Sequence, residues 1–290
     1  MKESRAYRTF RIINSLIMAF VVICTLYPFL YLIAQSFSSE AAVYAGKVTI
    51  FPIEFTTKTY EIILSKPDFF RYYGNTILYS IVGTVISVAG TAILAYPLSK
   101  EKLRLNKFFT PFVLFTMYFG GGLIPNYILV AKTLHMRDTI WAVVIPGAIS
   151  AYYVILMKTF FASLPGELEE AATVDGLTAY GIFAKITLPL SKPILATMVL
   201  FNMVGIWNNW FGPSLYLQSK EKWPVALYLR QIIDSAISTT EMGASSDIAT
   251  QIAATVKSSA MVLTALPIIC IYPFVQKYFV QGMMIGSVKG

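Results

Sequence analysis

Long apolar segments constrain this chain most, because six of them recur along the sequence with shorter polar stretches between them. An α-helix rises about 1.5 Å per residue, so roughly 20 apolar residues cross the hydrocarbon core of a bilayer. Backbone groups in lipid must also be satisfied within the segment, as they are in a helix. The sequence therefore predicts an all-α polytopic membrane protein with six transmembrane helices, at residues 12–34, 73–98, 108–130, 139–161, 194–212 and 259–280.

Composition agrees with this prediction. Hydrophobic residues make up 56% of the chain, charged residues make up 13%, and the mean hydropathy is +0.64. These values lie outside the range of soluble globular domains. The first apolar segment is longer than the core of a signal peptide, and no small-x-small cleavage site follows it, so we expect an uncleaved membrane anchor.

The distribution of charge predicts the orientation. The formal net charge is +8, and basic residues gather before the first predicted span and directly after the second. Cytoplasmic segments of membrane proteins carry an excess of Lys and Arg, so both termini are expected in the cytoplasm. The polar segment 163–193 carries more acids than bases, which is the wrong sign for phosphate, so no nucleic-acid partner is expected. The basic clusters are Arg5, Arg8 and Arg11, then Lys100, Lys102, Arg104 and Lys107.

Several kinds of chemistry are missing from the sequence. The middle parts of the predicted spans contain no Asp, Glu, Lys, Arg or His, although ion- and proton-coupled carriers need such groups at depth. The sequence also has no HExxH motif and no GxxxxGK[ST] motif. We therefore expect no catalytic residue, no metal site and no cofactor in this chain. The energy for any transport must come from a partner protein.

The segment 163–193 is the one long polar interruption that reads as folded helices. Pro165 suits the first turn of a helix, and the three glutamates that follow it favour the positive end of the helix dipole. Gly176 can end this helix, because glycine accepts the left-handed backbone geometry found there. Thr178 can cap a second short helix that runs to Ile186. The sequence predicts two short helices on the cytoplasmic side, between the fourth and fifth spans.

The spacing within this segment resembles the EAA loop of ATP-binding-cassette (ABC) importer permeases. The pattern reads Glu170-Ala171-Ala172, three residues, Gly176, nine residues, and then Ile186-x-Leu188-Pro189. The stretches 120–161, 207–216 and 277–290 are similar to the carbohydrate-uptake branch of binding-protein-dependent permeases, in particular to subunits that import complex oligosaccharides or polysaccharide fragments. The resemblance implies a type I ABC importer permease fold.

The resemblance also implies partners and roles. The first short helix would be a coupling helix that docks into a groove of the cytoplasmic ATPase. ATP and Mg would bind to that ATPase. The complex would contain a second homologous permease, two copies of the ATPase and an extracellular solute-binding protein. The expected domains are 1–71 (tail, first span and outer loop), 72–281 (transmembrane domain, with coupling helices at 163–189) and 282–290 (cytoplasmic tail). The expected coupling residues are Glu167, Glu170, Ala171, Ala172, Asp175, Gly176, Leu188 and Pro189.

Two places offer polar and aromatic side chains for a substrate path. Three consecutive glycines at 120–122 and a proline break the third predicted span, and the residues beside the break either line a passage or mark a helix end at the outer interface. Trp207 and Trp210 are three residues apart, which predicts a shared helical face. They either contact sugar rings or anchor the helix at the interface. The path candidates are Tyr118, Asn126, Tyr127, Asn202, Trp207, Asn208, Asn209 and Trp210.

Other interpretations remain open at this point. The chain could serve an ABC importer for a non-sugar solute, since the inner loop does not report the substrate. It could also be a membrane scaffold without transport, which would need no continuous polar path. The expected location is the bacterial cytoplasmic membrane, crossed several times, and the outer segment 214–257 is the candidate docking element for the binding protein.

Overall fold

The computed structural model describes residues 5–65, 67–100, 103–104, 106–241, 254–270 and 273. Within these ranges every regular element is helical, which confirms the all-α prediction. The chain forms two compact units. The first unit comprises Met1–Phe69 and Leu229–Pro267, and the second comprises Phe70–Tyr228 and Ile268–Gly290.

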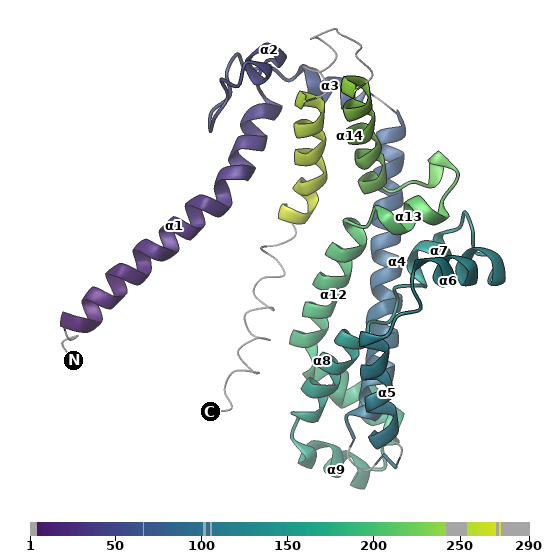
Figure 1. Cartoon of the computed structure of the whole chain (residues 1–290). Coiled ribbons are helices and arrows are strands. Elements are labelled where there is room, and N and C mark those ends of the chain that lie inside the picture. The colour runs from purple at the N-terminus through teal and green to yellow at the C-terminus, as the bar shows by residue number, and fades with distance from the viewer. Residues whose placement is uncertain are drawn as a thin grey trace. The chain divides into compact units, whose positions relative to one another are not determined.

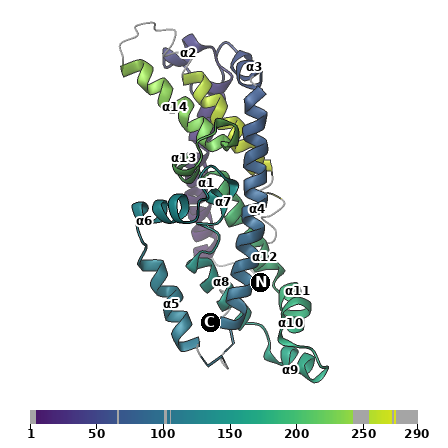
Figure 2. The same cartoon turned by 90° about the vertical axis from the view of Figure 1, so that its right-hand side faces the viewer.

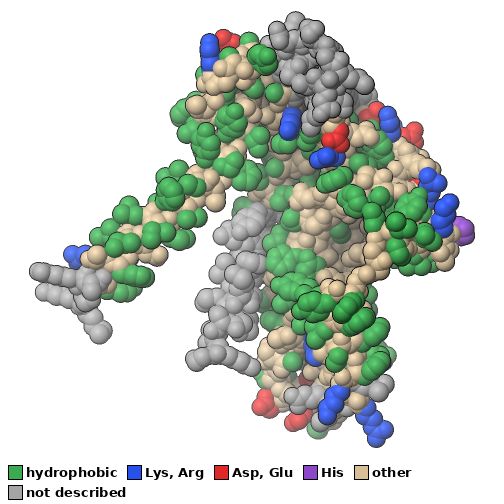
Figure 3. All heavy atoms as spheres, viewed as in Figure 1, with side chains coloured by type: hydrophobic (Ala, Val, Ile, Leu, Met, Phe, Trp, Pro, Cys, Tyr) green, Lys and Arg blue, Asp and Glu red, His purple; other side chains and the backbone are tan. Residues whose placement is uncertain are grey.

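The first unit is built around α1, which spans Arg5–Ser36. Its stretch Tyr7–Ser36 is long and apolar enough to cross a membrane, and hydrophobic side chains cover its whole length (Figure 3). The end of α1 is fixed by polar contacts, since the Tyr60 hydroxyl donates to Ser36 Oγ at 2.7 Å and Ser258 Oγ donates to Gln35 Oε1 at 2.9 Å. The other helices of this unit are α2 (Glu40–Tyr44), α3 (Lys58–Leu64), most of α14 (Val225–Glu241) and the helix Ala254–Cys270.

The second unit is organised along α4, which spans Pro67–Leu98 and contains the second candidate membrane span, Asp68–Leu98. α12 (Lys192–Trp207) runs beside α4, and α8 (Ala151–Ala162) packs against both (Figure 1). A Cβ atom on Gly83 would lie 2.6 Å from Ile206 Cδ1, so the glycine permits the close approach of α4 and α12. The buried core of this unit consists of Ala92, Ala95, Leu98, Val154, Met157, Phe161 and Met198.

The third predicted span is broken, as the glycine run indicated. α5 (Asn106–Tyr118) is followed by α6 (Leu123–Tyr127) and the π-helix η1 (Ile128–Thr133), and the two parts meet at 108° (Figure 2). Gly122 has a φ of 84°, a left-handed conformation that side-chain-bearing residues rarely adopt. The break therefore lies where the sequence placed it, but the segment does not continue straight to residue 130.

The fourth predicted span, 139–161, is not one helix. α7 (Ile140–Val144) ends before Pro146, and α8 begins only at Ala151. Pro146 and Gly147 lie in the non-helical segment between these two helices. Proline has no N–H to continue the helical hydrogen bonds, so α7 ends here although Ile145 itself keeps a helical conformation.

The number of spans differs from the sequence-based count. Within the described ranges, two helices are long and apolar enough to span a membrane, or up to four if each bent pair counts as one span. The second bent pair joins the segment Ala179–Leu190 to α12 at 79°. For the sixth predicted span, residues 259–270 form part of the helix Ala254–Cys270, and most of the remainder lies outside the described residues. Six transmembrane helices therefore stay a prediction.

Candidate functional site

The first helix of the segment 163–193 is α9, which spans Gly166–Val174 and ends in a Schellman motif. The Gly176 N–H donates to the Thr173 carbonyl at 3.0 Å, and the Leu177 N–H donates to the Ala172 carbonyl at 2.9 Å. Gly176 has a φ of 82°, the left-handed conformation that this motif requires. Pro165 lies one position before the first helical residue, where it serves as the N-cap. Both ends of α9 are therefore fixed by local sequence, as expected.

The second helical segment follows after the four residues 175–178. Thr178 accepts a hydrogen bond from the Gly181 N–H at 3.3 Å and so caps α10 (Ala179–Ile182). The chain continues through the π-helix η2 (Phe183–Thr187) into the short α11 (Leu188–Leu190). The predicted second helix is thus confirmed and extends further than residue 186. Figure 2 shows α9, α10 and α11 at one end of the second unit.

Aromatic packing attaches this loop to the helices of the second unit. Tyr96 on α4 lies 4.8 Å from Phe183 of η2, measured between ring centroids, and 6.3 Å from the buried Phe161 of α8. Lys100 forms an ion pair with Glu169 of α9 and lies 4.5 Å above the Tyr96 ring. The ring of Phe183 also lies 6.5 Å from that of Phe161, so the loop packs against both α4 and α8.

The outer surface of α9 and α10 combines carboxylates with exposed apolar side chains. Glu167 and Glu170 are exposed, and Val174 and Tyr180 are exposed by 88% and 86%. Leu168 is exposed by 43%. These three apolar residues were not predicted from the sequence as part of the coupling surface. They could have been, because large hydrophobic residues in a short polar loop have no core to fill.

The other predicted coupling residues take different positions. Ala171, Asp175 and Pro189 are exposed and can face a partner. Ala172 is only 4% exposed, so its side chain packs within the chain. Leu188 is half-buried and lines an apolar groove instead of the outer surface.

The path candidates near the broken third span do not come together. Tyr118 and Asn126 are exposed on either side of the break. Tyr127 instead stacks on the buried Tyr216 of α13 (Phe211–Tyr216), with ring centroids 5.9 Å apart and planes inclined by 7°. Tyr127, the last residue of α6, therefore packs α6 against α13. Its position in the sequence did not predict this packing role.

Asn202 is used in helix packing. Its Nδ2 donates to the Met198 carbonyl at 2.8 Å, and its Oδ1 accepts from Ser87 Oγ on α4 at 2.6 Å. The side chain is buried, so these bonds link α12 to α4 inside the second unit. Buried polar pairs of this kind hold membrane helices together.

The predicted shared face of Trp207 and Trp210 is wrong. α12 ends at Trp207 and Asn208 is its C-cap, so Trp210 lies beyond the helix. Trp207 is buried with its ring 6.0 Å from Tyr73, whereas Trp210 is exposed and its ring lies 5.6 Å from Phe211.

Asn208 and Asn209 cause this early end of α12. Short amide side chains compete with the helix for backbone hydrogen bonds. Asn209 Oδ1 accepts the Gly212 N–H at 3.1 Å and so supports the start of α13. Asn208 remains exposed. Of the eight path candidates, Tyr118, Asn126, Asn208 and Trp210 are exposed in this chain.

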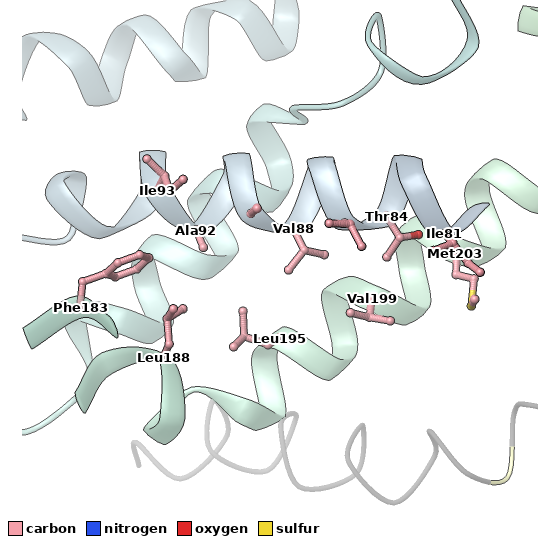
Figure 4. A pocket seen from close by; sticks show the side chains of 12 residues that line it. Ile81, Thr84, Val88, Ala92, Ile93, Phe183, Leu188, Leu195, Val199 and Met203 are labelled. Carbon is pink, nitrogen blue, oxygen red and sulfur yellow. The ribbon is translucent and has the colours of Figure 1, made fainter. Parts of the chain in front are cut away.

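An apolar groove lies between α4, α12 and the η2–α11 segment, with a volume of about 580 Å³. Figure 4 shows its lining, in which Val88 and Ala92 face Leu195 and Val199. Thr84 is the one lining side chain with a hydroxyl. Ligand sites combine apolar walls with a few placed polar groups, and the described lining of this groove offers a single hydroxyl.

A polar cluster connects two loops of the second unit. Asp138 Oδ1 accepts the N–H groups of Gln218 and Ser219, both at 3.0 Å. Its Oδ2 accepts from Ser219 Oγ at 2.7 Å and from Lys222 Nζ at 2.8 Å. Burial alone would raise the pKa of Asp138, but the hydrogen bonds from Lys222, Ser219 and Gln218 hold the pKa well below its usual range.

Two side chains of α4 also donate hydrogen bonds to this loop. Asn75 Nδ2 donates to the carbonyls of Glu221 and Trp223 at 2.7 and 3.0 Å. The Tyr79 hydroxyl donates to the Lys222 carbonyl at 2.7 Å. Residues 217–223 are therefore fixed on two sides. The segment 214–257 was predicted as a docking element, but the cluster was not predicted, because its members are about 80 and 145 residues apart in the chain.

The described part of the chain contains no group of three His, Cys, Asp or Glu side chains that could hold a metal ion.

Comparison with known proteins gives matches that cover most of the chain. A family model described as binding-protein-dependent transport system inner membrane component matches residues 90–285. Protein LplC of Bacillus subtilis (strain 168) is 42% identical over 290 residues, which is 100% of this chain and 98% of the relative. The polygalacturonan/rhamnogalacturonan transport system permease protein YtcP of the same organism is 37% identical and covers 96% of this chain and 97% of the relative.

A solved structure also resembles the whole chain. The crystal structure of a bacterial ABC transporter involved in the import of the acidic polysaccharide alginate contains a chain that is 33% identical to this one. The TM-score is 0.82, and the match covers 96% of this chain and 99% of that chain.

Proposed function

The chain belongs to the family of binding-protein-dependent transport system inner membrane components, and from this premise we propose that it is a permease subunit of an ATP-driven importer of oligosaccharides or polysaccharide fragments. It is an integral membrane protein of the bacterial cell membrane. With a second homologous permease it would form the pathway, while two copies of an ABC ATPase supply the energy and an extracellular solute-binding protein delivers the sugar.

The exposed surface of α9 and α10 carries the proposal that energy enters here. Val174 and Tyr180 are almost fully exposed at an end of the second unit where Glu167 and Glu170 also project. Apolar side chains rimmed by charge are typical of a protein–protein interface. Because α9 is held to α4 and α8 through Glu169 and η2, an ATPase that moved this surface would move the helices beside the pathway.

The relatives support a carbohydrate substrate. One bears a name that specifies polygalacturonan and rhamnogalacturonan, and the structural relative belongs to an alginate importer. All three polymers contain uronates, which are anionic. We therefore rank uronate-containing fragments first among the candidate substrates, ahead of neutral oligosaccharides and non-sugar solutes.

This function requires no covalent chemistry in the chain itself. We propose that the subunit is not an enzyme and binds no cofactor, and that ATP and Mg bind to the partner ATPase. We further propose that both termini, and the loop that contains α9, lie in the cytoplasm, as the positive-inside distribution of Lys and Arg indicates.

Uptake by cells that lack this gene tests the proposal. The cells would receive fluorescent oligogalacturonate, alginate oligosaccharide or arabino-oligosaccharide, with and without a plasmid copy of the gene. We expect uptake of at least one uronate oligomer to depend on the plasmid, and the tagged chain to co-purify with an ATPase and a second permease.

Two results would contradict the proposal. A chain that purifies without any nucleotide hydrolase would remove the energy source and favour a scaffold. Complexes that assemble and yet take up none of the three sugars would favour a different solute. The two measurements therefore separate a wrong assembly from a wrong substrate.

A further inference from the structure

A second pocket lies at the beginning of α5, near the C-terminal half of α8, and has a volume of about 680 Å³. Three cationic side chains line it, namely Arg104, Lys107 and Lys158. Asn106 and Thr110 add polar groups, and the remaining lining residues are apolar. No acidic side chain is among the lining residues. Three positive charges around one pocket repel one another unless an anion joins them.

The three cations have no carboxylate partner among the described residues. Lys158 Nζ donates to Thr110 Oγ1 at 2.9 Å, which uses one of its three donors. Arg104 and Lys107 take part in no ion pair within the same ranges. Lys100 differs from them, since it pairs with Glu169 on α9. The charge of the pocket is therefore left for an external anion.

A chain of hydrogen bonds fixes the polarity of the pocket. Thr110 Oγ1 donates to Asn106 Oδ1 at 2.6 Å, so this hydroxyl accepts from Lys158. Asn106 Nδ2 in turn donates to the carbonyls of Leu98 and Lys100, at 2.9 and 3.2 Å. With these acceptors occupied, the groups left for a ligand are the donors of two ammonium groups and a guanidinium. Such a set of donors selects phosphate or carboxylate oxygens.

The surroundings of the pocket distinguish a lipid from a soluble anion. No residue of α5 is buried, and Phe108, Phe112 and Phe115 are exposed by 64%, 55% and 54%. α5 also belongs to a bent pair of membrane-spanning composition. Figure 3 shows Lys and Arg side chains beside hydrophobic ones at the end of the second unit. An acyl chain can therefore lie along α5 while its headgroup enters the pocket.

We propose that this pocket binds the phosphate headgroup of an anionic phospholipid, with Lys158 at its base and Arg104 and Lys107 at its rim. Basic pockets between membrane helices hold anionic headgroups on the cytoplasmic side. The site is independent of the transported solute and does not use the surface of α9. It would link α5 to α8 through the bound phosphate.

Lipid retention by the purified complex tests this site. The complex would be exchanged into nanodiscs of phosphatidylcholine that contain a minor fraction of phosphatidylglycerol, released into detergent, and examined by native mass spectrometry for bound phosphatidylglycerol. Each cation near a headgroup changes affinity by about five-fold. We therefore expect Lys158→Gln to lower retention about five-fold, and the triple variant with Arg104→Gln and Lys107→Gln to abolish it.

Matched variants control for charge and folding. The triple variant Lys47→Gln, Lys132→Gln and Lys192→Gln removes the same net charge from exposed lysines that do not line the pocket, and it should retain the lipid. Lys107→Arg with Lys158→Arg keeps the charge and should also retain it. Co-purification of the partner subunits confirms that each variant is assembled.

Two outcomes would overturn the inference. Equal retention of phosphatidylglycerol by the native complex and by the pocket triple variant would show that the pocket is not the site. Displacement of the lipid by glycerol phosphate, but not by sodium chloride of equal ionic strength, would assign the pocket to a soluble phosphate instead.

Discussion

Replacing Asp138 by Asn tests whether one carboxylate fixes the loop at residues 217–223. The side chain of Asp138 is 24% exposed and receives four hydrogen bonds, two at each oxygen. An asparagine can keep the acceptor for the N–H groups of Gln218 and Ser219, but its amide nitrogen accepts nothing from Ser219 Oγ or Lys222. Lys222 keeps its bond to the carbonyl of residue 138.

The expected cost follows from the bonds that are lost. A neutral hydrogen bond contributes about 1 kcal/mol, and a partly exposed ion pair contributes up to about 1 kcal/mol because solvent screens it. Asp138→Asn should therefore lower the free energy of loop opening by about 1–2 kcal/mol. This change raises the open population by a factor of roughly 5–30.

Hydrogen–deuterium exchange of peptides that cover residues 217–223 measures this population. Exchange in the Asp138→Asn complex should be faster by that factor at neutral pH. Asp234→Asn is the matched control, because Asp234 pairs with Arg230 one helical turn away and both side chains are about half exposed. Its loss should change exchange in residues 217–223 by less than two-fold.

The pH dependence provides a second test. Since the folded-state pKa of Asp138 is lowered, its stabilising contribution is complete above the ordinary carboxyl pKa near 4 and is lost as the pH falls through the folded value. The difference between native and Asp138→Asn complexes, corrected for intrinsic exchange, should stay constant between about pH 5 and 8 and shrink only at more acidic pH. Equal exchange in both complexes at neutral pH would refute the reasoning.

Three further substitutions test the inner loop and the helix packing. Gly176→Val places a side chain at a φ of 82°, which should strain the end of α9 by about 1–2 kcal/mol. This variant should lower uptake more than it lowers ATP hydrolysis. The control Gly166→Ala, at an ordinary φ with open space around it, should change neither rate. Tyr180→Ser removes an exposed apolar contact and should reduce ATPase co-purification without reducing the amount of chain in the membrane. Asn202→Leu breaks the bond from Ser87 and should lower thermal stability in detergent, with a double-mutant coupling of about 1 kcal/mol with Ser87→Ala.

The sequence was most informative where the determinants are local. Pro165, the glutamates after it and Gly176 lie within 12 residues and fix both ends of α9 without help from other elements. Thr178 likewise caps α10 through a bond to a residue three positions away. α1 and α4 were predicted because their apolar runs are uninterrupted for more than 18 residues.

Predictions failed where several local signals compete or where distant residues meet. Gly120–Gly122 indicated a break, but the angle of 108° depends on what α6 and η1 pack against. Asn208 and Asn209 are ordinary helix-ending residues, and the apolar run around them obscured this signal. The cluster at Asp138 joins loops about 80 residues apart, so no local pattern contains it.

The burial of some path candidates reduces the number of their side chains that could contact a sugar. A pathway shared between two permeases must be lined by side chains that are exposed on each chain alone. Asn202 and Trp207 are buried, and their contacts with Ser87 and Tyr73 lie within one chain. Their substitution would change stability first and transport only as a consequence. Asn208 and Trp210 are exposed in the segment where α12 ends, and the Trp210 ring lies 5.6 Å from that of Phe211. The end of the helix, which ruled out the shared tryptophan face, therefore leaves these two side chains at the surface of this chain.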